Sequence, residues 1–355
     1  VRLERRRGGE IDLVVHDAAD ALRAWRWDGY AWLSTTHSPL STRLEPGPSR
    51  DVEPFALASL PPASPVARPG ADFDRDGRAD VLWRHSTTGA LSIWLVQGAT
   101  VAGSISLRPE SFADTDWQIR AMGDLDRDGR TDVLWHHRRT GELYAWYLDG
   151  TLPVGGEYLS PRTAEDPRAQ VRGAADFDGD GFLDLLWQDP ATGELSLWLM
   201  QGVVRSATAS LGAAPVSDPL WQVRGLVDFD GDGDPDVVWH HARTGALAFW
   251  RMDGTTVATV EEFSPGGMGD ARWRLAEVGD FDGDRRPDLL WHHRATGELL
   301  VWFMNGTQRV AAVPMSPSRV SDLRWAIVPT DDAAASRRAV RSLRRPSTPW
   351  RAPTR

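Results

Sequence analysis

Residues 116–150 read DWQIRAMGDLDRDGRTDVLWHHRRTGELYAWYLDG, and the same pattern returns along the chain at a constant spacing. It contains a short apolar segment, an Asp/Gly-rich loop, a strand-like DVLWHH, a TGE turn and an aromatic LYAWYL that ends in Asp-Gly. Self-similarity at a fixed period is the signature of a repeat architecture. The first aspartate of each loop marks a period of 52 residues, at Asp72, Asp124, Asp176, Asp228 and Asp280.

The pieces of each repeat are typical of short strands. They are rich in β-branched and aromatic residues and are bounded by Gly, Asp, Asn or Pro, which is the pattern of strands and turns. No segment shows a sustained helical period. Four short strands in a repeat of this length match a propeller blade, whereas a solenoid coil uses shorter units. The fold class is therefore predicted to be all-β, a β-propeller.

The two ends of the chain carry partial repeats. Residues 8–29 match the second and third strands of a repeat, with Asp12 aligned to Asp80, and the opening strand is missing there. Residues 322–332 match an opening strand, with Trp325 in register with Trp273, and then the match stops. We therefore expect one propeller over residues 1–332, with six four-stranded blades (seven being possible) and the first blade closed by strands from both termini. Such closure removes exposed strand edges.

Two segments fall outside the repeat. A Pro/Ser-rich stretch at about residues 38–65 is too short for a further blade and is interpreted as a surface loop. Residues 333–355 contain seven arginines and no acid, which predicts a disordered tail. No signal peptide is visible, because no apolar region follows the charged residues 1–7. No run of 18 apolar residues predicts a transmembrane segment.

Composition narrows the chemistry. The chain has no cysteine and no lysine, which excludes disulfides, zinc-thiolate sites, Schiff-base catalysis and the lysine of a phosphate-binding loop. The formal net charge is −10, and no nucleic-acid partner is expected. Twenty of the 50 acidic residues lie at matched positions of the five loops. The acidity is therefore concentrated where a cation could neutralise it.

Each of the five loops has the form D-x-D-x-D-x-x-x-D, with carboxylates at positions one, three, five and nine. Four clustered carboxylates repel one another unless a cation lies between them. Calcium takes six to eight oxygen ligands, which matches four carboxylates, the backbone carbonyl of position seven and a water, whereas magnesium fits less well. About five structural calcium ions are predicted, with the ligands Asp72, Asp74, Asp76, Arg78, Asp80; Asp124, Asp126, Asp128, Arg130, Asp132; Asp176, Asp178, Asp180, Phe182, Asp184; Asp228, Asp230, Asp232, Asp234, Asp236; and Asp280, Asp282, Asp284, Arg286, Asp288.

These loops differ from EF-hands. Position twelve, where an EF-hand has its bidentate glutamate, is tryptophan in all five loops, so the aspartate at position nine is the expected bidentate ligand. Glycine at position six supplies a left-handed turn in four loops. Arg285 takes that position in the fifth loop, whose site is therefore expected to be the weakest. Only Asp12 and Asp332 remain of the motif at the two ends, so the closing blade is expected to lack calcium.

The combined motif, DFDGDG followed by DLLW, TGE and WxMxG, resembles the FG-GAP or VCBS repeats of bacterial surface and secreted proteins. The resemblance covers roughly residues 8–332. Similar loops occur in the integrin α-subunit propeller and in some fungal propeller lectins. The resemblance implies calcium-stabilised blades, an extracellular or cell-surface location and an adhesive or ligand-binding role, and it names no ligand.

Three further residue series leave alternatives open. Tryptophan recurs at two strand positions, and core packing is favoured over sugar stacking there; Trp117, Trp221 and Trp273, at the blade entries, are weak candidates for sugar contacts. The His-His pairs are unlike a zinc site, because adjacent strand residues point to opposite faces. An arginine series is compatible with an anion-binding ring or with pairing to neighbouring acids; its members are Arg68, Arg120, Arg172 and Arg224.

Taken together, the sequence predicts a monomeric, calcium-binding module for cell adhesion or carbohydrate binding, with a glycan or a protein as ligand. It contains no Gly-x-Ser-x-Gly elbow and no His-Glu-x-x-His, so an enzyme is not expected. The alternative is a propeller enzyme, a polysaccharide lyase or hydrolase, in which calcium has a structural role.

Overall fold

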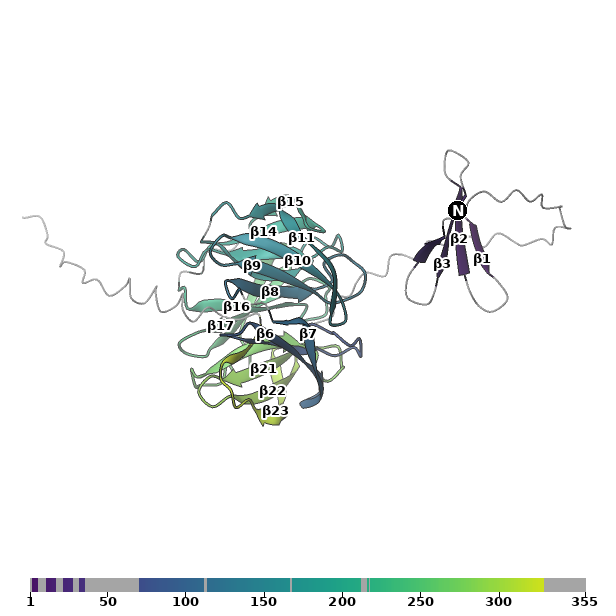
Figure 1. The fold of residues 1–355 in the computed structure, drawn as a ribbon. Helices are drawn as coiled ribbons and strands as arrows, with labels where there is room; N and C mark the ends of the chain where they lie inside the picture. Colours follow the sequence, from purple (N-terminus) through teal and green to yellow (C-terminus); the bar gives the residue numbers. More distant parts are fainter. Residues whose placement is uncertain are drawn as a thin grey trace, which may run out of the picture. The chain divides into compact units, whose positions relative to one another are not determined.

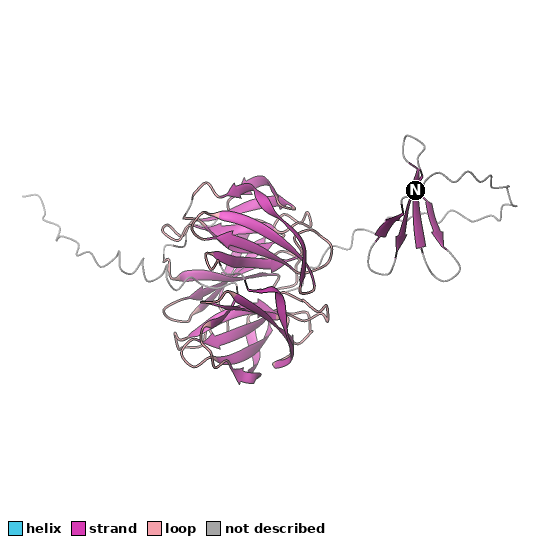
Figure 2. Ribbon diagram, viewed as in Figure 1, coloured by secondary structure: helices cyan, strands magenta, loops and turns pink. Residues whose placement is uncertain are grey.

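The computed structural model describes residues 2–5, 11–16, 22–27, 32–35, 70–111, 114–166, 168–211, 216 and 218–328. Contacts within the chain divide it into two compact units, Val1–Ser59 and Leu60–Arg355. The described residues form strands and loops only, as Figure 2 shows. Among them, no helix is long and apolar enough to span a bilayer.

The N-terminal unit contains a complete four-stranded sheet. Its strands pair in the order β1-β2-β3-β4, and each pair is antiparallel. The prediction that this repeat lacks its opening strand is wrong, because Arg2 of the first strand pairs with Val14 of the second. The four strands are β1 (Arg2–Arg5), β2 (Ile11–His16), β3 (Leu22–Trp27) and β4 (Trp32–Thr35).

The second unit contains five four-stranded antiparallel groups (Figure 1). Single parallel bridges, Ser316 to Thr100 and Ser160 to Val204, join four of them in pairs into two larger sheets. In order, the groups are β24 (Trp325–Ile327), β5 (Val81–His85), β6 (Ala90–Gln97) and β7 (Thr100–Ser111); β8 (Trp117–Gly123), β9 (Asp132–His137), β10 (Glu142–Asp149) and β11 (Leu152–Thr163); β12 (Gln170–Ala175), β13 (Asp184–Gln188), β14 (Leu195–Gln201) and β15 (Val204–Ala209); β16 (Trp221–Val227), β17 (Asp236–His241), β18 (Leu247–Asp253) and β19 (Thr256–Glu261); β20 (Trp273–Gly279), β21 (Asp288–His293), β22 (Glu298–Asn305) and β23 (Gln308–Arg319).

Burial explains why the strands of a group differ in composition. All six residues of β9, DVLWHH, are buried, so this strand is covered on both faces. β10 alternates between buried and partly exposed residues, and most of β11 is exposed. Strands covered on both faces need near-continuous apolar runs, whereas outer strands tolerate polar residues. The poor pattern of the fourth strand in the sequence follows from its exposed position.

The closing strand pairs differently from the prediction. β24 pairs with β5, with Trp325 opposite His85, and not with the strand Ile11–His16 of the N-terminal repeat. The predicted closure of the first blade by both termini is therefore wrong. The same register joins Trp117 to His137 in the second group, so β24 takes the place of an opening strand in the group of β5. The N-terminal repeat already has β1 beside β2, which leaves β24 for β5.

The five groups form a closed, propeller-like ring through five apolar clusters. Each cluster combines buried side chains from two neighbouring groups, and the last cluster joins the fifth group to the first. Neighbouring residues of each second strand serve two different clusters because they point to opposite faces. Each cluster contains second-strand residues of both groups: Leu82 and Val133, Leu134 and Leu185, Leu186 and Val237, Val238 and Leu289, and Leu290 and Val81.

Three predictions concern residues outside the described ranges. They are the surface loop at about residues 38–65, the disordered tail over residues 333–355, and the isolated Asp332.

We predict that Ile327→Ala weakens ring closure. Ile327 in β24 is 5% exposed and packs in the cluster that joins the fifth group to the first. Truncating a buried isoleucine costs about 2–4 kcal/mol of unfolding free energy. Val310→Ala is the control, because Val310 is 70% exposed on β23 and its truncation should cost less than about 0.5 kcal/mol. Urea unfolding compares the two, and equal midpoints would contradict the pairing of β24 with β5.

Candidate metal centres in the aspartate loops

The backbone of each aspartate loop turns left-handed twice, at positions four and six. At position six, Gly77 has a φ of 90° and Arg285 a φ of 69°, so the arginine keeps the conformation of the glycine. At position four, Arg75 and Arg127 have φ values of 62° and 68°. A non-glycine residue in this region costs about 1–2 kcal/mol. Loops one, two and five each carry one such residue, so backbone strain does not single out the fifth loop as the weakest site.

The turns bring three carboxylates together in loops one to four. In four loops, oxygens of the aspartates at positions one, three and nine all lie within 4.8 Å of one another. Oxygens that bind one calcium at about 2.3–2.6 Å lie at most about 5 Å from one another, so these spacings are compatible with a shared ion. These residues therefore fit a calcium ion. The four clusters are Asp72, Asp74 and Asp80; Asp124, Asp126 and Asp132; Asp176, Asp178 and Asp184; and Asp228, Asp230 and Asp236.

The aspartate at position nine has a second role, which the sequence alone does not reveal. Asp132 is 1% exposed, and its Oδ2 accepts a hydrogen bond from the Leu125 N–H inside the loop at 3.0 Å. Its Oδ1 accepts a bond from the Leu148 N–H of β10 at 2.9 Å. The carboxylate therefore ties the loop to the third strand of its group. The same two bonds recur at Asp80, Asp184, Asp236 and Asp288.

Burial disfavours the ionised form of this carboxylate. It raises the pKa of Asp132 to about 7, the two backbone hydrogen bonds lower that pKa, and the charges of Asp126 and Asp128 raise it further. The pKa is raised to about 7 at Asp80, Asp184, Asp236 and Asp288 as well, with burial as the largest cause. A bound cation would favour the ionised form. The donor set is thus one whose charge a divalent ion would stabilise.

The other two predicted ligand positions are arranged differently. The aspartate at position five lies outside the four clusters, and its Oδ1 accepts a hydrogen bond from the N–H of position seven, as Asp76 does from Arg78 at 2.9 Å. The same bond occurs in all five loops. Such Asx turns hold the loop in shape. Ligation by position five and by the carbonyl of position seven stays a prediction.

Neighbouring loops are bound to one another. The Ala79 N–H of loop one donates to the Asp280 carbonyl of loop five at 2.7 Å. Thr131 Oγ1 of loop two donates to the Asp72 carbonyl of loop one at 3.0 Å. The guanidinium of Arg127 lies 4.6 Å from the ring centre of Phe182 in loop three. The aspartate loops therefore lie next to one another along the ring, and the shape of one affects the next.

The tryptophans of position twelve belong to the core. Trp83, Trp135, Trp187, Trp239 and Trp291 are at most 2% exposed. Each lies 4.7 to 5.7 Å, between ring centres, from the tryptophan of the third strand in its own group. This confirms the core-packing interpretation of position twelve.

The three weak sugar candidates each contact a histidine. Trp117 meets His137 edge-on with ring centres 5.0 Å apart, and Trp221 and Trp273 meet His241 and His293 in the same way. The other end of the histidine approaches an aspartate, as His241 Nε2 does Asp218 Oδ2 at 3.1 Å. Its Nδ1 bonds a threonine of the TGE-type turn at 2.7 to 2.9 Å in four groups, through Thr88, Thr140, Thr244 and Thr296. The second histidine thus holds together the opening strand and the turn of its own group. Its recurrence in the sequence was the signal for this role.

The first histidine of each pair faces the next group, so the two rings of a pair do not meet at one metal. His136 lies edge-on to Trp187, with ring centres 5.7 Å apart, and His292 meets Trp83 at 5.6 Å. Asp114, Asp116 and His137 also cluster within 4.8 Å. There Asp116 already accepts a bond from Arg138 Nε at 2.8 Å and another from Arg139. The aspartate loops remain the stronger metal candidates.

Comparison with known proteins agrees with the repeat. The FG-GAP-like repeat family matches the chain over residues 72–135, 124–187 and 228–291, which together make up half of its length. No curated protein matches. Among solved structures, a Bacteroides uniformis ATCC 8492 protein described as a putative 6-phosphogluconolactonase is 12% identical, with a TM-score of 0.36 over 92% of this chain and 87% of its own. A Bacteroides caccae protein of unknown function is 11% identical, with a TM-score of 0.36 over 67% of this chain and 82% of its own. Both likenesses are too low to support an inference.

We predict that Asp132→Asn and Asp126→Asn have different effects. An amide has one acceptor oxygen, so Asp132→Asn loses one of its two buried backbone bonds and destabilises the fold by about 1–3 kcal/mol even with calcium chelated. Asp126→Asn keeps an acceptor for the Asp128 N–H, which is bonded at 3.1 Å, and relieves repulsion in the loop. It should therefore weaken calcium binding without destabilising the chelated protein. Urea unfolding in EGTA, with calcium titration by calorimetry, tests both; equal losses in EGTA would contradict the two roles.

Proposed function

This chain belongs to the FG-GAP-like repeat family, and from that premise we propose that it is an extracellular, calcium-stabilised propeller that acts as a binding and adhesion module. The observation that carries the proposal is the repeated cluster of three carboxylates, each including one buried aspartate with a pKa raised to about 7. A single acidic loop would have little weight. The same geometry in successive repeats favours one shared purpose, which is to hold an ion in each loop.

We assign five blades to the ring within residues 70–328. The assignment is supported by five four-stranded groups, five apolar clusters between them, and the pairing of β24 with β5. The N-terminal sheet β1–β4 is a further copy of the repeat in a unit of its own. Its Asp12 stands without the other aspartates of the motif, so no ion is proposed there.

The proposed role of calcium is structural. The ligand at position nine also anchors the loop to the third strand, and adjacent loops are hydrogen-bonded to each other. An ion in one loop would therefore stabilise a group and its neighbour together. Carboxylates committed in this way are poor candidates for acid-base catalysis, which favours a binding module over the enzyme alternative.

The proposed ligand class and the proposed location are inferred from the family. Repeats of this family are typical of surface and extracellular proteins, and short calcium loops of extracellular modules work at millimolar calcium. A glycan or a protein is the proposed ligand of a monomeric module. Trp117, Trp221 and Trp273 remain candidates for sugar contacts, since each is only partly buried and its histidine covers one edge.

Removing calcium should lower stability strongly. At a calcium concentration tenfold above the dissociation constant, each site adds about 1.4 kcal/mol, so five sites would raise the melting temperature by roughly 15–25 °C.

The effect of calcium should depend on pH, because protons compete with calcium for the aspartates of position nine. The pKa of these aspartates is raised to about 7 in the fold, so the ion-free fold loses stability as pH rises from about 4 to 7. The calcium effect should therefore be larger at pH 8 than at pH 5. Melting curves with EGTA and with calcium measure it; unchanged curves and no calcium uptake in calorimetry would end the proposal.

A glycan array with calcium and with EGTA tests the binding role. Retention of a glycan in calcium, lost in EGTA and without turnover, is the expected result. Release of product from a retained polysaccharide would instead establish the enzyme alternative. Asp126→Asn serves as a variant with one weakened loop, which should retain most of the binding because the other loops still hold the ring.

A further inference from the structure

The chain contains a single asparagine, Asn305, and a glycine follows it. Asn305 ends β22 and pairs with Gln308 at the start of β23, so Gly306 and Thr307 form the turn between these strands (Figure 1). Gly306 has a φ of 55°, which a glycine adopts without strain. The other four groups of the ring have the same turn, and the residue before the glycine is Gln97, Asp149, Gln201 or Asp253.

The turn of the fifth group is held by fewer contacts than that of the first. The side chain of Asn305 is exposed, and neither its amide nor the Gly306 N–H donates a hydrogen bond to any residue that the structure describes. In the first group, Gln97 Nε2 donates to an aspartate of the first loop at 3.3 Å. The Gly98 N–H there donates to the Phe281 carbonyl at 2.7 Å. The amide of Asn305 and the nitrogen of Gly306 are therefore both available for reaction.

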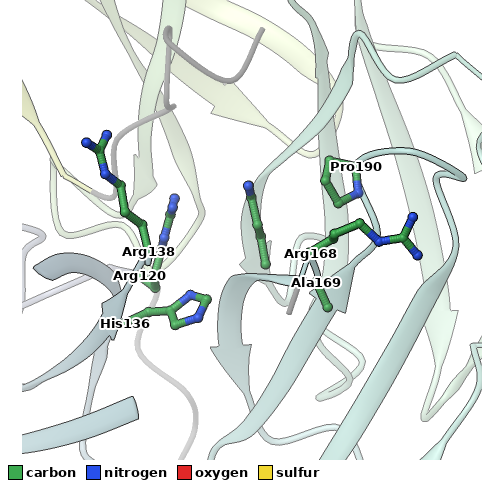
Figure 3. Close-up of a pocket in the computed structure, with 7 residues that line it drawn as sticks. Arg120, His136, Arg138, Arg168, Ala169 and Pro190 are labelled. Atoms are coloured by element: carbon green, nitrogen blue, oxygen red, sulfur yellow. The ribbon is translucent and has the colours of Figure 1, made fainter. Parts of the chain in front are cut away.

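Water reaches this turn directly from the solvent. No atom lies within 4 Å of the place where a Cβ of Gly306 would stand. A cavity of about 230 Å³ opens elsewhere in the ring, beside Arg120, His136 and Ala169 (Figure 3), and none of its lining residues belongs to the fifth group. Chemistry at Asn305 therefore takes place at the open surface and needs no pocket.

An asparagine followed by glycine can lose its amide to water. The Gly306 nitrogen loses its proton and attacks Cγ of Asn305, an attack that no Cβ obstructs. The bond from Cγ to Nδ2 breaks, and that nitrogen leaves as ammonia with the proton. Water then opens the succinimide ring, at Cγ to give aspartate or at the main-chain carbonyl to give isoaspartate. Either product carries a carboxylate in place of the amide, and nothing is oxidised or reduced.

The new carboxylate would lie beside the fifth aspartate loop. The N–H of Met304, the residue before Asn305, donates to Asp288 Oδ1 at 2.9 Å. Asp288 is the position-nine aspartate of that loop. The hydrogen bond therefore fixes the end of β22 against the loop, and residue 305 is the next residue along the chain.

The second group shows what a carboxylate at this turn does. Asp149 Oδ1 lies 3.2 Å from Arg130 Nη1, and Arg130 is position seven of the second loop. The fifth loop has Arg286 at position seven. Its side chain is 56% exposed, and its Nη1 is 4.0 Å from Asp284 Oδ2. Arg286 is thus placed to accept a second, closer carboxylate.

We propose that Asn305-Gly306 is a site of spontaneous deamidation, and that the carboxylate it creates pairs with Arg286 and ties the turn to the fifth loop. The reaction would give the fifth group the ion pair that the second group has by sequence. The proposal does not depend on calcium in the loops and does not rest on the proposed function.

Incubation of the full chain at alkaline pH, followed by mass analysis of its peptides, tests the reaction. The peptide that contains residues 305–306 should gain the mass difference between an acid and an amide, and faster as pH rises, because the attacking nitrogen must be deprotonated. Asn305→Gln should react at least tenfold more slowly (about 1.4 kcal/mol of activation free energy), because its attack closes a larger ring. Gln precedes the glycine in the first and third groups, so this variant is expected to fold.

The reaction is overturned if the amide stays intact while a free peptide of residues 303–308 reacts fully, or if Asn305→Gln reacts as fast. A sugar on the amide would overturn it as well, since Asn305-Gly306-Thr307 is also an acceptor triplet for N-glycosylation.

Melting curves test the ion pair. Asn305→Asp represents the aspartate product and should melt up to about 4 °C above the unaltered chain at low ionic strength. The gain should disappear when Arg286→Gln is added, and also in high salt. Gln201→Asp is the matched control, because the third loop has Phe182 in place of the arginine, so no gain is expected. A shift that is the same with and without Arg286, or the same in Gln201→Asp, would overturn the pairing.

Discussion

The ring depends on five buried aspartates, whose ionised form is disfavoured by that burial. Each one closes its own loop and at the same time bonds to the third strand of its group, as Asp132 does with Leu125 and Leu148. Removing a carboxylate from water is unfavourable unless hydrogen bonds or an opposite charge compensate. Two backbone N–H groups supply part of the compensation, and a divalent ion shared with positions one and three would supply the rest.

That local arrangement explains how stability spreads through the ring. Between the groups, buried residues of each second strand alternate between two apolar clusters, so that no group has a core of its own. Above these clusters the aspartate loops are linked by hydrogen bonds such as that of Thr131 with Asp72. A group that loses its loop geometry therefore weakens contacts on both sides. Repeat proteins in which each unit contacts only its neighbours behave in this coupled way.

The sequence predicts the repeated parts well, because a residue that recurs at the same position of every repeat stands out from residues that vary between repeats. The period, the all-β class, the loop carboxylates and the buried tryptophan after them all follow from matched positions such as Asp124 and Trp135. The sequence predicts less where two distant segments compete to pair with the same strand. Arg2–Arg5 has no clear strand pattern, yet it pairs with the second strand of its repeat and leaves β24 to β5. The second role of Asp132 depends on a bond to a strand 16 residues away, which no spacing rule reveals.

The partner of β5 is supplied by β24, about 240 residues later in the chain. During synthesis, the second, third, fourth and fifth groups each take their four strands from one continuous stretch of chain, whereas the first group waits for residues 325–327. Until then its inner edge is unpaired and open to other strands. The growing polypeptide is thus exposed to mispairing at the edge of β5 until residues 325–327 have emerged from the ribosome.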